Sequence, residues 1–459
     1  MFNRSKLKSG KYSHTSQWRD YQFELQKKDA KRRSYRRMPG YAVLLCVLVL
    51  TVYGAFTLLD KMLFVPGKTH SRIFADNVEK FDKPTLQKIN RMIPFTNATN
   101  KSFELNTGGK TFEIKSSLNP SLQNFIIEHI DRKNSRFFAF VAIEAETGRI
   151  LAMVSYDKTN PDGDTCTNSD YPAASLFKII TSAAAIEKYN FNCNTPVTFN
   201  GNKYTLYKRQ LKDRLNKYTN RISFKKAFAD SVNPVFGKIG LHLLGKSTIE
   251  SYASAFGFNQ KFNFEIPLAP SCLTINDDPY NWAEIACGFN NKTRISPLHG
   301  ALMVSIILNN GKLIEPTLID NITRDNHTVY QRNSHTMAQI INPHTAITLK
   351  KLMNASVTSG TASKSFSGFK KDKVLSKLNI GGKTGSINNN AQHLKYDWFE
   401  GFAEEKNGKK KIITSVLVVH DKYIGIRAAR YSRMAIKKYF KNYYAKAEIN
   451  KHAKKSTSL

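Results

Sequence analysis

The pattern of apolar and polar residues begins with one long uncharged run. Residues 41–59 read YAVLLCVLVLTVYGAFTLL, nineteen positions without a charge, between an Arg-Arg pair and an Asp-Lys pair. At ~1.5 Å per residue, a helix of this length nearly crosses a ~30 Å hydrocarbon core. No small-x-small cleavage site with a polar mature start follows the run, which argues against a removed signal peptide. The pattern predicts one uncleaved transmembrane helix over residues 41–59.

The charges before this run predict its orientation. Residues 1–40 hold twelve Lys or Arg and three acidic residues. Positively charged flanks stay in the cytoplasm. We therefore expect residues 1–40 to form a basic cytoplasmic tail and the chain after residue 59 to lie outside the cytoplasm.

Shorter periodic patterns beyond residue 110 predict a mixed domain. An alternating run over 111–115 leads to Asn119-Pro120, a cap and first-turn proline that start a helix. Two hairpins are expected, one over 138–154 and one over 398–419, and a helix follows over 428–444. Strands at both ends with helices between them indicate an α+β domain with a central antiparallel sheet flanked by helices. The terminal strands should share that sheet.

The remaining segments carry little pattern. Residues 60–105 show no clear period and are expected to form a short exported linker or pedestal. Residues 446–459 are basic and polar, which predicts a disordered tail. The main domain is therefore placed at 106–445.

The net charge limits the classes of partner. The chain has 70 Lys+Arg and 35 Asp+Glu, a formal charge of +35. Nucleic acid is the usual partner of such charge, but the predicted topology places most of it outside the cytoplasm. Anionic lipid headgroups, wall polymers or a merely solvated basic surface remain as alternatives.

The cysteines leave their redox state open. Cys46 lies in the apolar run, and four others follow it: Cys166, Cys193, Cys272 and Cys287. An even number in an exported domain allows one or two disulfides. No CxxC or HExxH spacing indicates a metal, so we expect neither a metal nor another cofactor.

Three short motifs with chemical meaning occur in order along the chain. They are Ser175-x-x-Lys178, Ser231-x-Asn233 and Lys383-Thr384-Gly385-Ser386. The S-x-x-K pattern also occurs at Ser5, Ser223 and Ser367, so context has to choose among the copies. Only Ser175 opens a helical pattern with an apolar face.

The residue types in these motifs fit nucleophilic catalysis. A serine at a helix start lies near free backbone N–H groups and the positive end of the helix dipole. Lys178 is one helical turn away, and a lysine can deprotonate a serine if burial or a nearby cation such as Lys383 favours its neutral form. Ser231 can relay a proton and Asn233 can bind an amide. The glycine-containing run at Lys383 suits a strand edge to which a peptide adds.

With these motifs in place, residues 111–419 resemble the transpeptidase domain of penicillin-binding proteins, a β-lactamase-like fold. Other landmarks of that family occur at Thr147-Gly148-Arg149, Pro172-Ala173-Ala174, Gly360-Thr361-Ala362 and Asp397-Trp398-Phe399. The sequence departs from the family at Gly288-Phe289-Asn290, where many relatives have a second glycine. There is also no room for the glycosyltransferase domain of bifunctional relatives.

The resemblance implies a role for each motif residue. Ser175 would be acylated, Lys178 would be its base and Ser231 would join the proton relay. Asn233 would hold the peptide, and the Lys383-Thr384-Gly385-Ser386 strand would bind the terminal carboxylate. Backbone N–H groups of Ser175 and Ser386 would form the oxyanion hole.

The implied function is a monofunctional peptidoglycan DD-transpeptidase in the bacterial inner membrane, with its catalytic domain outside the cytoplasm. Its expected partners are peptidoglycan stem peptides, β-lactams, the membrane and wall-synthesis proteins, and nucleic acid is not among them. The alternatives are a DD-carboxypeptidase, a serine β-lactamase or β-lactam sensor on the same fold, a non-catalytic wall-synthesis scaffold, and a basic membrane-surface binding protein.

Overall fold

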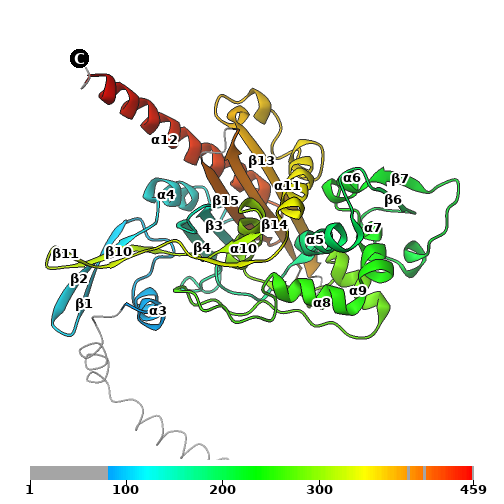
Figure 1. Ribbon diagram of the computed structural model, residues 1–459, viewed down its shortest axis with the longest axis horizontal. Helices are drawn as coiled ribbons and strands as arrows, with labels where there is room; N and C mark the ends of the chain where they lie inside the picture. The colour runs from blue at the N-terminus through cyan, green and yellow to red at the C-terminus, as the bar shows by residue number, and fades with distance from the viewer. Residues whose placement is uncertain (1–80, 390–392, 407–409, 457–459) are drawn as a thin grey trace, which may run out of the picture. The chain divides into compact units, whose positions relative to one another are not determined.

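The central element is a five-stranded antiparallel sheet whose strands come from two distant parts of the chain (Figure 1). The computed structural model describes residues 81–389, 393–406 and 410–456. The strand order is β13-β14-β15-β3-β4. The strands are β3 Ser135–Glu144, β4 Ile150–Asp157, β13 Leu378–Asn389, β14 Leu394–Glu405 and β15 Lys411–His420. Phe140 on β3 pairs with Val416 on β15, so both predicted hairpins join one sheet, as the sequence indicated.

Both faces of this sheet are buried. Successive residues of β3 alternate between two hydrophobic clusters, since Phe138 and Phe140 belong to one and Ala139 and Val141 to the other. Helices α4 (Pro120–Glu128) and α12 (Ala428–Ser456) pack on the first face. Helix α10 (Pro297–Leu308), buried along its whole length, packs on the second face, and α11 (Pro343–Thr358) packs against β13.

A mostly helical lobe lies beside the sheet, on the right in Figure 1. It contains α5 Lys178–Tyr189, α6 Phe224–Ala229, α7 Asn233–Lys238, α8 Gly245–Ala255 and α9 Pro279–Cys287, and the π-helix η3 Ile239–Leu244. A hairpin of β6 (Pro196–Phe199) and β7 (Asn220–Ser223) forms its outer edge, and a short pair of β5 (Tyr171–Pro172) and β8 (Arg294–Ile295) joins it to the sheet region. The three sequence motifs lie where this lobe meets β13.

The helix starts that the sequence marked with caps are confirmed. Asn119 accepts a hydrogen bond from the Leu122 N–H at the start of α4, with Pro120 in the first turn. The predicted helix over 428–444 is α12, but it continues to Ser456. The expected disordered tail is therefore wrong up to that residue, because 446–456 contains no Gly or Pro and is rich in Ala, Lys and Glu, which favour helix.

Residues 60–80 of the expected linker or pedestal lie outside the described residues, and the rest of that segment contains regular structure. Helix α3 (Lys83–Met92) begins at the capping Asp82, and β1 (Ser102–Thr107) pairs with β2 (Lys110–Ser116). These strands join β10 (Ile319–Arg324) and β11 (His327–Gln331) in a four-stranded sheet, while β9 (Lys312–Ile314) pairs with β12 (Thr336–Gln339). A domain boundary at residue 106 would cut strand β1. The distant partners of this segment belong to α3, since Gln87 donates to the Phe264 carbonyl oxygen and Lys83 pairs with Glu315.

Two further expectations concern the membrane and the cysteines. The predicted tail 1–40 and anchor 41–59 lie outside the described residues, and none of the helices in the described ranges combines the length and apolarity needed to span a bilayer. Cys166, Cys193, Cys272 and Cys287 are all free thiols. The disulfides that the sequence allowed are therefore absent among these four.

Candidate active site

Ser175 lies in a tight turn immediately before α5. The turn is the 3₁₀ helix η1 (Ala174–Phe177), and α5 begins at Lys178, so the nucleophile candidate precedes the α-helix and does not open it. Ala174 has a left-handed φ of +48°, which costs a non-glycine residue of the order of 1–3 kcal/mol. Strain of this kind persists only where the surroundings hold the backbone in place.

Gly288 provides the space for this turn. A Cβ at Gly288 would lie 1.8 Å from the carbonyl oxygen of Ala174 and 2.9 Å from the Ser175 nitrogen. Gly288 also has a left-handed φ of +68° at the end of α9. The sequence left the Gly288-Phe289-Asn290 loop uncertain, and here it packs directly against the nucleophile turn, with Phe289 and Asn290 lining the cleft.

Lys178 is completely buried beneath Ser175. Its Nζ donates to Ser175 Oγ and to Asn233 Oδ1, both at 2.8 Å, and also to the carbonyl oxygen of Cys287. Burial lowers the pKa of Lys178 to about 8, since removal from water penalises the charged form. A substantial fraction is therefore neutral near physiological pH, as a general base requires.

The Ser231-Val232-Asn233 motif forms the connection between α6 and α7. Ser231 occupies the predicted turn with a left-handed φ of +58°. Asn233 is the first residue of α7, and its Nδ2 donates to the carbonyl oxygen of Tyr204 at 2.9 Å. Because Asn233 Oδ1 accepts from Lys178, this side chain connects the motif to Lys178, and a second Nδ2–H is left for a ligand.

Lys383 lies on β13, the edge strand of the five-stranded sheet. Its Nζ donates to Ser231 Oγ at 2.9 Å and to the Thr384 carbonyl oxygen at 2.7 Å. Burial and then the charge of Lys178 lower the pKa of Lys383 well below its usual range. Repulsion disfavours the state in which both lysines carry a charge.

The neighbouring residues of β13 complete the strand that borders the cleft. Thr384 Oγ1 is hydrogen-bonded to Thr361 Oγ1 at 2.6 Å. A Cβ at Gly385 would lie 3.4 Å from Leu176 Cγ, so β13 passes close to the nucleophile turn at this glycine. The free side of β13 has no partner strand among the described residues. An extended peptide can hydrogen-bond to such an edge.

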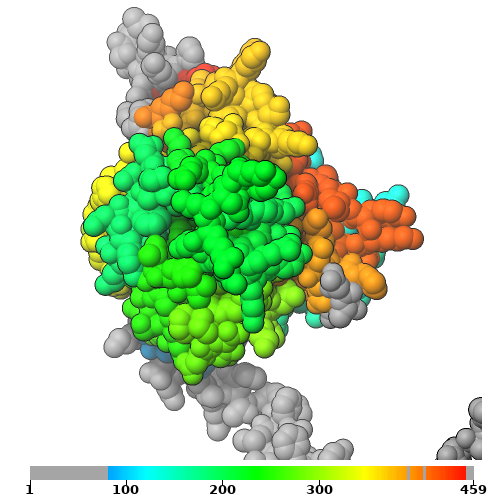
Figure 2. All heavy atoms as spheres, turned by 90° about the vertical axis from the view of Figure 1, so that its right-hand side faces the viewer, coloured from blue at the N-terminus to red at the C-terminus, as the bar shows by residue number. Residues whose placement is uncertain are grey.

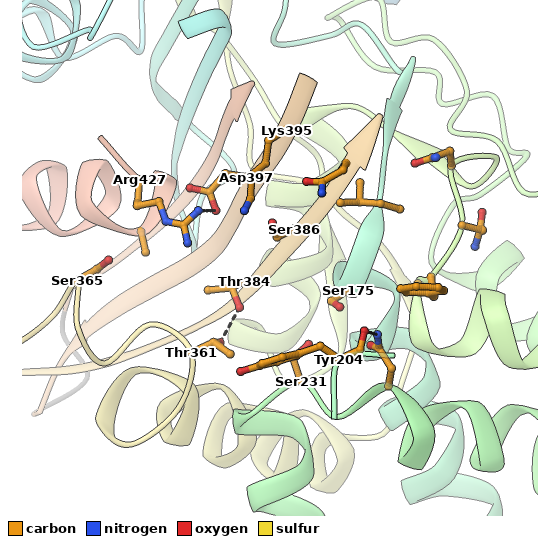
Figure 3. Close-up of a pocket in the computed structure, with 18 residues that line it drawn as sticks. Ser175, Tyr204, Ser231, Thr361, Ser365, Thr384, Ser386, Lys395, Asp397 and Arg427 are labelled. Atoms are coloured by element: carbon orange, nitrogen blue, oxygen red, sulfur yellow. Dashed lines mark hydrogen bonds and ion pairs between the residues drawn. The ribbon is translucent and has the colours of Figure 1, made fainter. Parts of the chain in front are cut away.

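All the motifs meet at one cleft of about 750 Å³ (Figure 3). Ser175, Ser231, Asn233, Thr384 and Ser386 line it, whereas Lys178 and Lys383 lie buried beneath its wall. The other S-x-x-K serines in the described range have different surroundings. Ser223 caps α6 by accepting from the Lys226 N–H, and Ser367 lies in an exposed loop.

Several lining residues had no signal in the motifs. Tyr204, Ser365, Lys395 and Arg427 each come from a different segment and reach the cleft only in the folded chain. Arg427 forms an ion pair at 3.7 Å with Asp397, whose other oxygen accepts from the Ala428 N–H at the start of α12. Among the described residues, no three His, Cys, Asp or Glu side chains lie together as a metal site.

Residues 138–442 match the family model described as "Penicillin binding protein transpeptidase domain", about two thirds of the chain. The chain belongs to this family. The transpeptidase domain thus covers α5, the Ser231 turn and β13, which together form the cleft. Membership implies serine acyl transfer as the class of chemistry, and it confirms the resemblance that the sequence showed.

The matches to curated relatives cover only part of each chain. Stage V sporulation protein D of Bacillus subtilis is 23% identical over 60% of this chain and 44% of its own length. A peptidoglycan D,D-transpeptidase PbpA of Mycolicibacterium smegmatis is 25% identical over 47% of this chain and 50% of its own length. The chain spans about half the length, or less, of the curated relatives that it matches.

Solved structures share the fold. The imipenem acyl-enzyme of penicillin-binding protein A from M. tuberculosis has a TM-score of 0.58 at 21% identity, covering 71% of this chain and 79% of that one. Penicillin-binding protein 2B of Streptococcus pneumoniae has a TM-score of 0.58 at 18% identity, covering 72% and 60%. The predicted α+β transpeptidase fold is therefore confirmed for the transpeptidase domain.

Proposed function

We propose that this chain is a monofunctional peptidoglycan DD-transpeptidase that cross-links stem peptides through an acyl-enzyme on Ser175. The observation that carries the proposal is the 2.8 Å contact between Ser175 Oγ and the buried Lys178, whose pKa is lowered to about 8. The relatives named peptidoglycan D,D-transpeptidase support the reaction. The same cleft would bind penicillin covalently, because a β-lactam resembles the terminal D-Ala-D-Ala amide.

In the acylation step, Ser175 Oγ bonds to the carbonyl carbon of the penultimate D-alanine while neutral Lys178 accepts the hydroxyl proton. Backbone N–H groups of Ser175 and Ser386 would stabilise the oxyanion. The C–N bond to the terminal D-alanine then breaks, and its nitrogen takes up the proton, relayed through Ser231. An amine from a second stem peptide attacks the ester, loses a proton to Lys178 and restores Ser175.

Substrate binding falls to the edge strand and to Asn233. Lys383, Thr384 and Ser386 would hold the terminal carboxylate, and Gly385 would let the peptide backbone come close to the strand. Asn233 would donate its remaining Nδ2–H to a peptide carbonyl. This assignment is supported by the position of Asn233, Thr384 and Ser386, which all line the cleft.

The location is part of the same proposal. We place residues 41–59 in the inner membrane as a single span, with residues 1–40 in the cytoplasm and the transpeptidase domain on the opposite side. The charge asymmetry and the uncharged run in the sequence support this topology. Wall-synthesis proteins would be neighbours there.

Penicillin labelling of the full-length protein in detergent tests the nucleophile. Intact-mass spectrometry should show one stable penicilloyl adduct, and peptide mapping should locate it on Ser175. Ser175→Ala should remove the adduct, whereas Ser367→Ala should keep it because that serine has no buried lysine beside it. An adduct on another residue, or undiminished labelling of Ser175→Ala, contradicts the assignment.

The fate of the acyl group then separates the related reactions. Rapid loss of the penicilloyl adduct would indicate a β-lactamase in place of a transpeptidase. With a D-Ala-D-Ala peptide, transfer to an added amine supports the transpeptidase, and release by water alone supports the carboxypeptidase. Absence of any adduct would leave a non-catalytic scaffold.

A further inference from the structure

A basic, aromatic loop extends from the helical lobe next to the cleft. It comprises residues 200–219 between β6 and β7, which we call the basic loop. Figure 2 faces this lobe, coloured green. The loop holds six cations and one acid, which are Lys203, Lys208, Arg209, Lys212, Arg214, Lys217 and Asp213. None of these seven residues belongs to the three motifs of the active site.

The basic loop has a fixed internal structure despite its lack of strands. The buried Gln210 side chain accepts from the Tyr207 N–H and the Thr205 hydroxyl, and it donates to the carbonyl oxygens of Asn200 and Asn202. These four bonds measure 2.9–3.0 Å. The surface that the loop presents is therefore held in place before any ligand arrives.

The charge of the basic loop is largely uncompensated. Lys203 pairs with Asp230 at 3.3 Å, and Asp213 pairs with Lys238 at 2.8 Å. The other five cations are exposed and form no ion pair within the part of the chain that the structure describes; they are Lys208, Arg209, Lys212, Arg214 and Lys217. Such a concentration of one sign attracts a polyanion.

Aromatic rings alternate with these cations. Tyr204, Tyr207 and Tyr218 are 51%, 52% and 74% exposed. Each ring lies beneath a cation, with centroid distances of 5.1 Å to Lys203, 5.3 Å to Arg209 and 5.1 Å to Lys217. Exposed rings offer flat apolar faces with a polar tip, which suit a ligand built from ring units that also carries charge.

The basic loop is continuous with the catalytic cleft. Tyr204 lines the cleft together with Ser175, and its carbonyl oxygen accepts from Asn233 (Figure 3). A polymer that lies on the loop can therefore present a side branch to the nucleophile. This continuity favours the substrate polymer over a membrane surface, since a planar bilayer could not also enter the cleft.

We propose that the basic loop binds the glycan-peptide strand of peptidoglycan that carries the reacting stem peptide. The cations would contact carboxylates of neighbouring stem peptides, and the tyrosines would pack against sugar rings. This inference rests on the proposed transpeptidase function. Under this proposal, the basic loop binds the polymer and the acylation reaction takes place in the cleft. Penicillin is too small to need the loop, so its reaction with Ser175 should not depend on the loop.

The test uses sedimentation of the full-length protein in detergent with purified peptidoglycan sacculi. The loop variant is Arg209→Gln/Lys212→Gln/Arg214→Gln, and its matched control is Lys370→Gln/Lys371→Gln/Lys373→Gln, which removes three exposed lysines from another loop. Three lost surface ion pairs should weaken sacculus binding roughly 3- to 100-fold at low salt. The control should bind like the wild type, and amidation of the sacculus carboxylates should reduce wild-type binding to the level of the loop variant.

Penicillin acylation of the same samples separates the two proposals. The expected result is unchanged acylation of Ser175 in the loop variant together with weaker sacculus binding. Equal losses in loop and control variants, or binding indifferent to amidation, would overturn the role of the loop even if acylation is normal. A loop effect seen on anionic phospholipid vesicles and absent on sacculi would also overturn it. Loop-dependent sacculus binding without any acylation would reject the transpeptidase proposal alone.

Discussion

Lys178 is held between two opposing influences. The Lys178 ammonium donates hydrogen bonds to Ser175 Oγ, Asn233 Oδ1 and the Cys287 carbonyl oxygen. These bonds stabilise the charged form of the lysine. Complete burial opposes this charge. The result is a pKa of about 8, close to the range where a lysine is most useful as a base.

The first prediction concerns the pH dependence of acylation. Because Lys178 must be neutral to accept the Ser175 proton, the second-order rate of penicillin acylation should rise about tenfold per pH unit below pH 8 and level off above it. Rapid-quench mixing followed by intact-mass spectrometry measures this rate at pH values between 6 and 9. A flat profile would exclude Lys178 as the titrating base, and Lys178→Ala should lose at least about 100-fold at every pH.

A second buried group, Glu265, has no part in the cleft. Its Oε1 accepts from the backbone N–H groups of Leu318 and Ile319, which ties the loop after α8 to the start of β10. Burial raises the pKa of Glu265 to about 7, and its proton is therefore bound more tightly in the folded chain than in the unfolded one.

Stability should follow from this difference. A carboxyl with a raised folded pKa contributes fully below its unfolded value of about 4.5, and that contribution declines as the pH rises to about 7. Glu265→Gln keeps the oxygen that accepts both N–H bonds but cannot ionise. We compare the unfolding free energy of this variant with that of the wild type. The difference should shift by about 1–3 kcal/mol in favour of the variant when the pH rises from 4 to 8. Chemical denaturation of both proteins at pH 4 and at pH 8 measures this shift. A difference in unfolding free energy that is the same at both pH values would contradict the prediction.

At the scale of elements, the residue that ends α9 lies very close to the turn that holds Ser175. Gly288→Ala would place a Cβ 1.8 Å from the Ala174 carbonyl oxygen, and the Ser175 turn would have to shift. A displacement of about 1 Å at a reacting group can cost of the order of 100-fold in rate. We expect a loss of that size in penicillin acylation.

Gly368→Ala is the matched control for this substitution. Gly368 has a similar φ of +73°, but no heavy atom lies within 4 Å of the position that its Cβ would occupy. It should cost about 1–2 kcal/mol of stability and leave acylation unchanged. Equal acylation rates in both alanine variants would show that Gly288 acts only through its backbone conformation.

Elements with local signals could be predicted from the sequence, and those defined by distant partners could not. The β3–β4 and β14–β15 hairpins and the capped start of α4 were found because alternation and caps are local. Strand β1 was missed because it is a short edge strand in which only Leu105 is buried, so its sequence gives a weak signal. The continuation of α12 was missed because its last turns are polar and lack an apolar face.

The same division applies to the site. The motifs located Ser175, Lys178, Ser231 and Lys383, and the roles assigned to them stay predictions. Tyr204 had no signal, since it belongs to an irregular loop whose place beside the cleft depends on Asn233. The left-handed backbone at Ala174 also could not be foreseen, because alanine rarely adopts it.

For the molecule as a whole, the charge asymmetry leads to a test of topology. Protease added to intact spheroplasts should digest the large C-terminal part and spare residues 1–40, because the basic flank of the uncharged run stays in the cytoplasm. An epitope at each end makes both parts visible on a blot. Protection of the C-terminal part in intact spheroplasts, with digestion after lysis, would reverse the proposed orientation.

The pairing of β3 with β15 also sets the order of events during biogenesis. Val141 lies opposite Ser415, so the sheet closes only after most of the chain has been synthesised. Such non-local pairing is slow to form. Under the proposed topology, Ser175 crosses the membrane long before Lys383 and the strands that hold it. A nascent chain halted during export would therefore carry Ser175 without Lys383. Such a chain would be unable to form an acyl-enzyme with stem peptides of the cell wall.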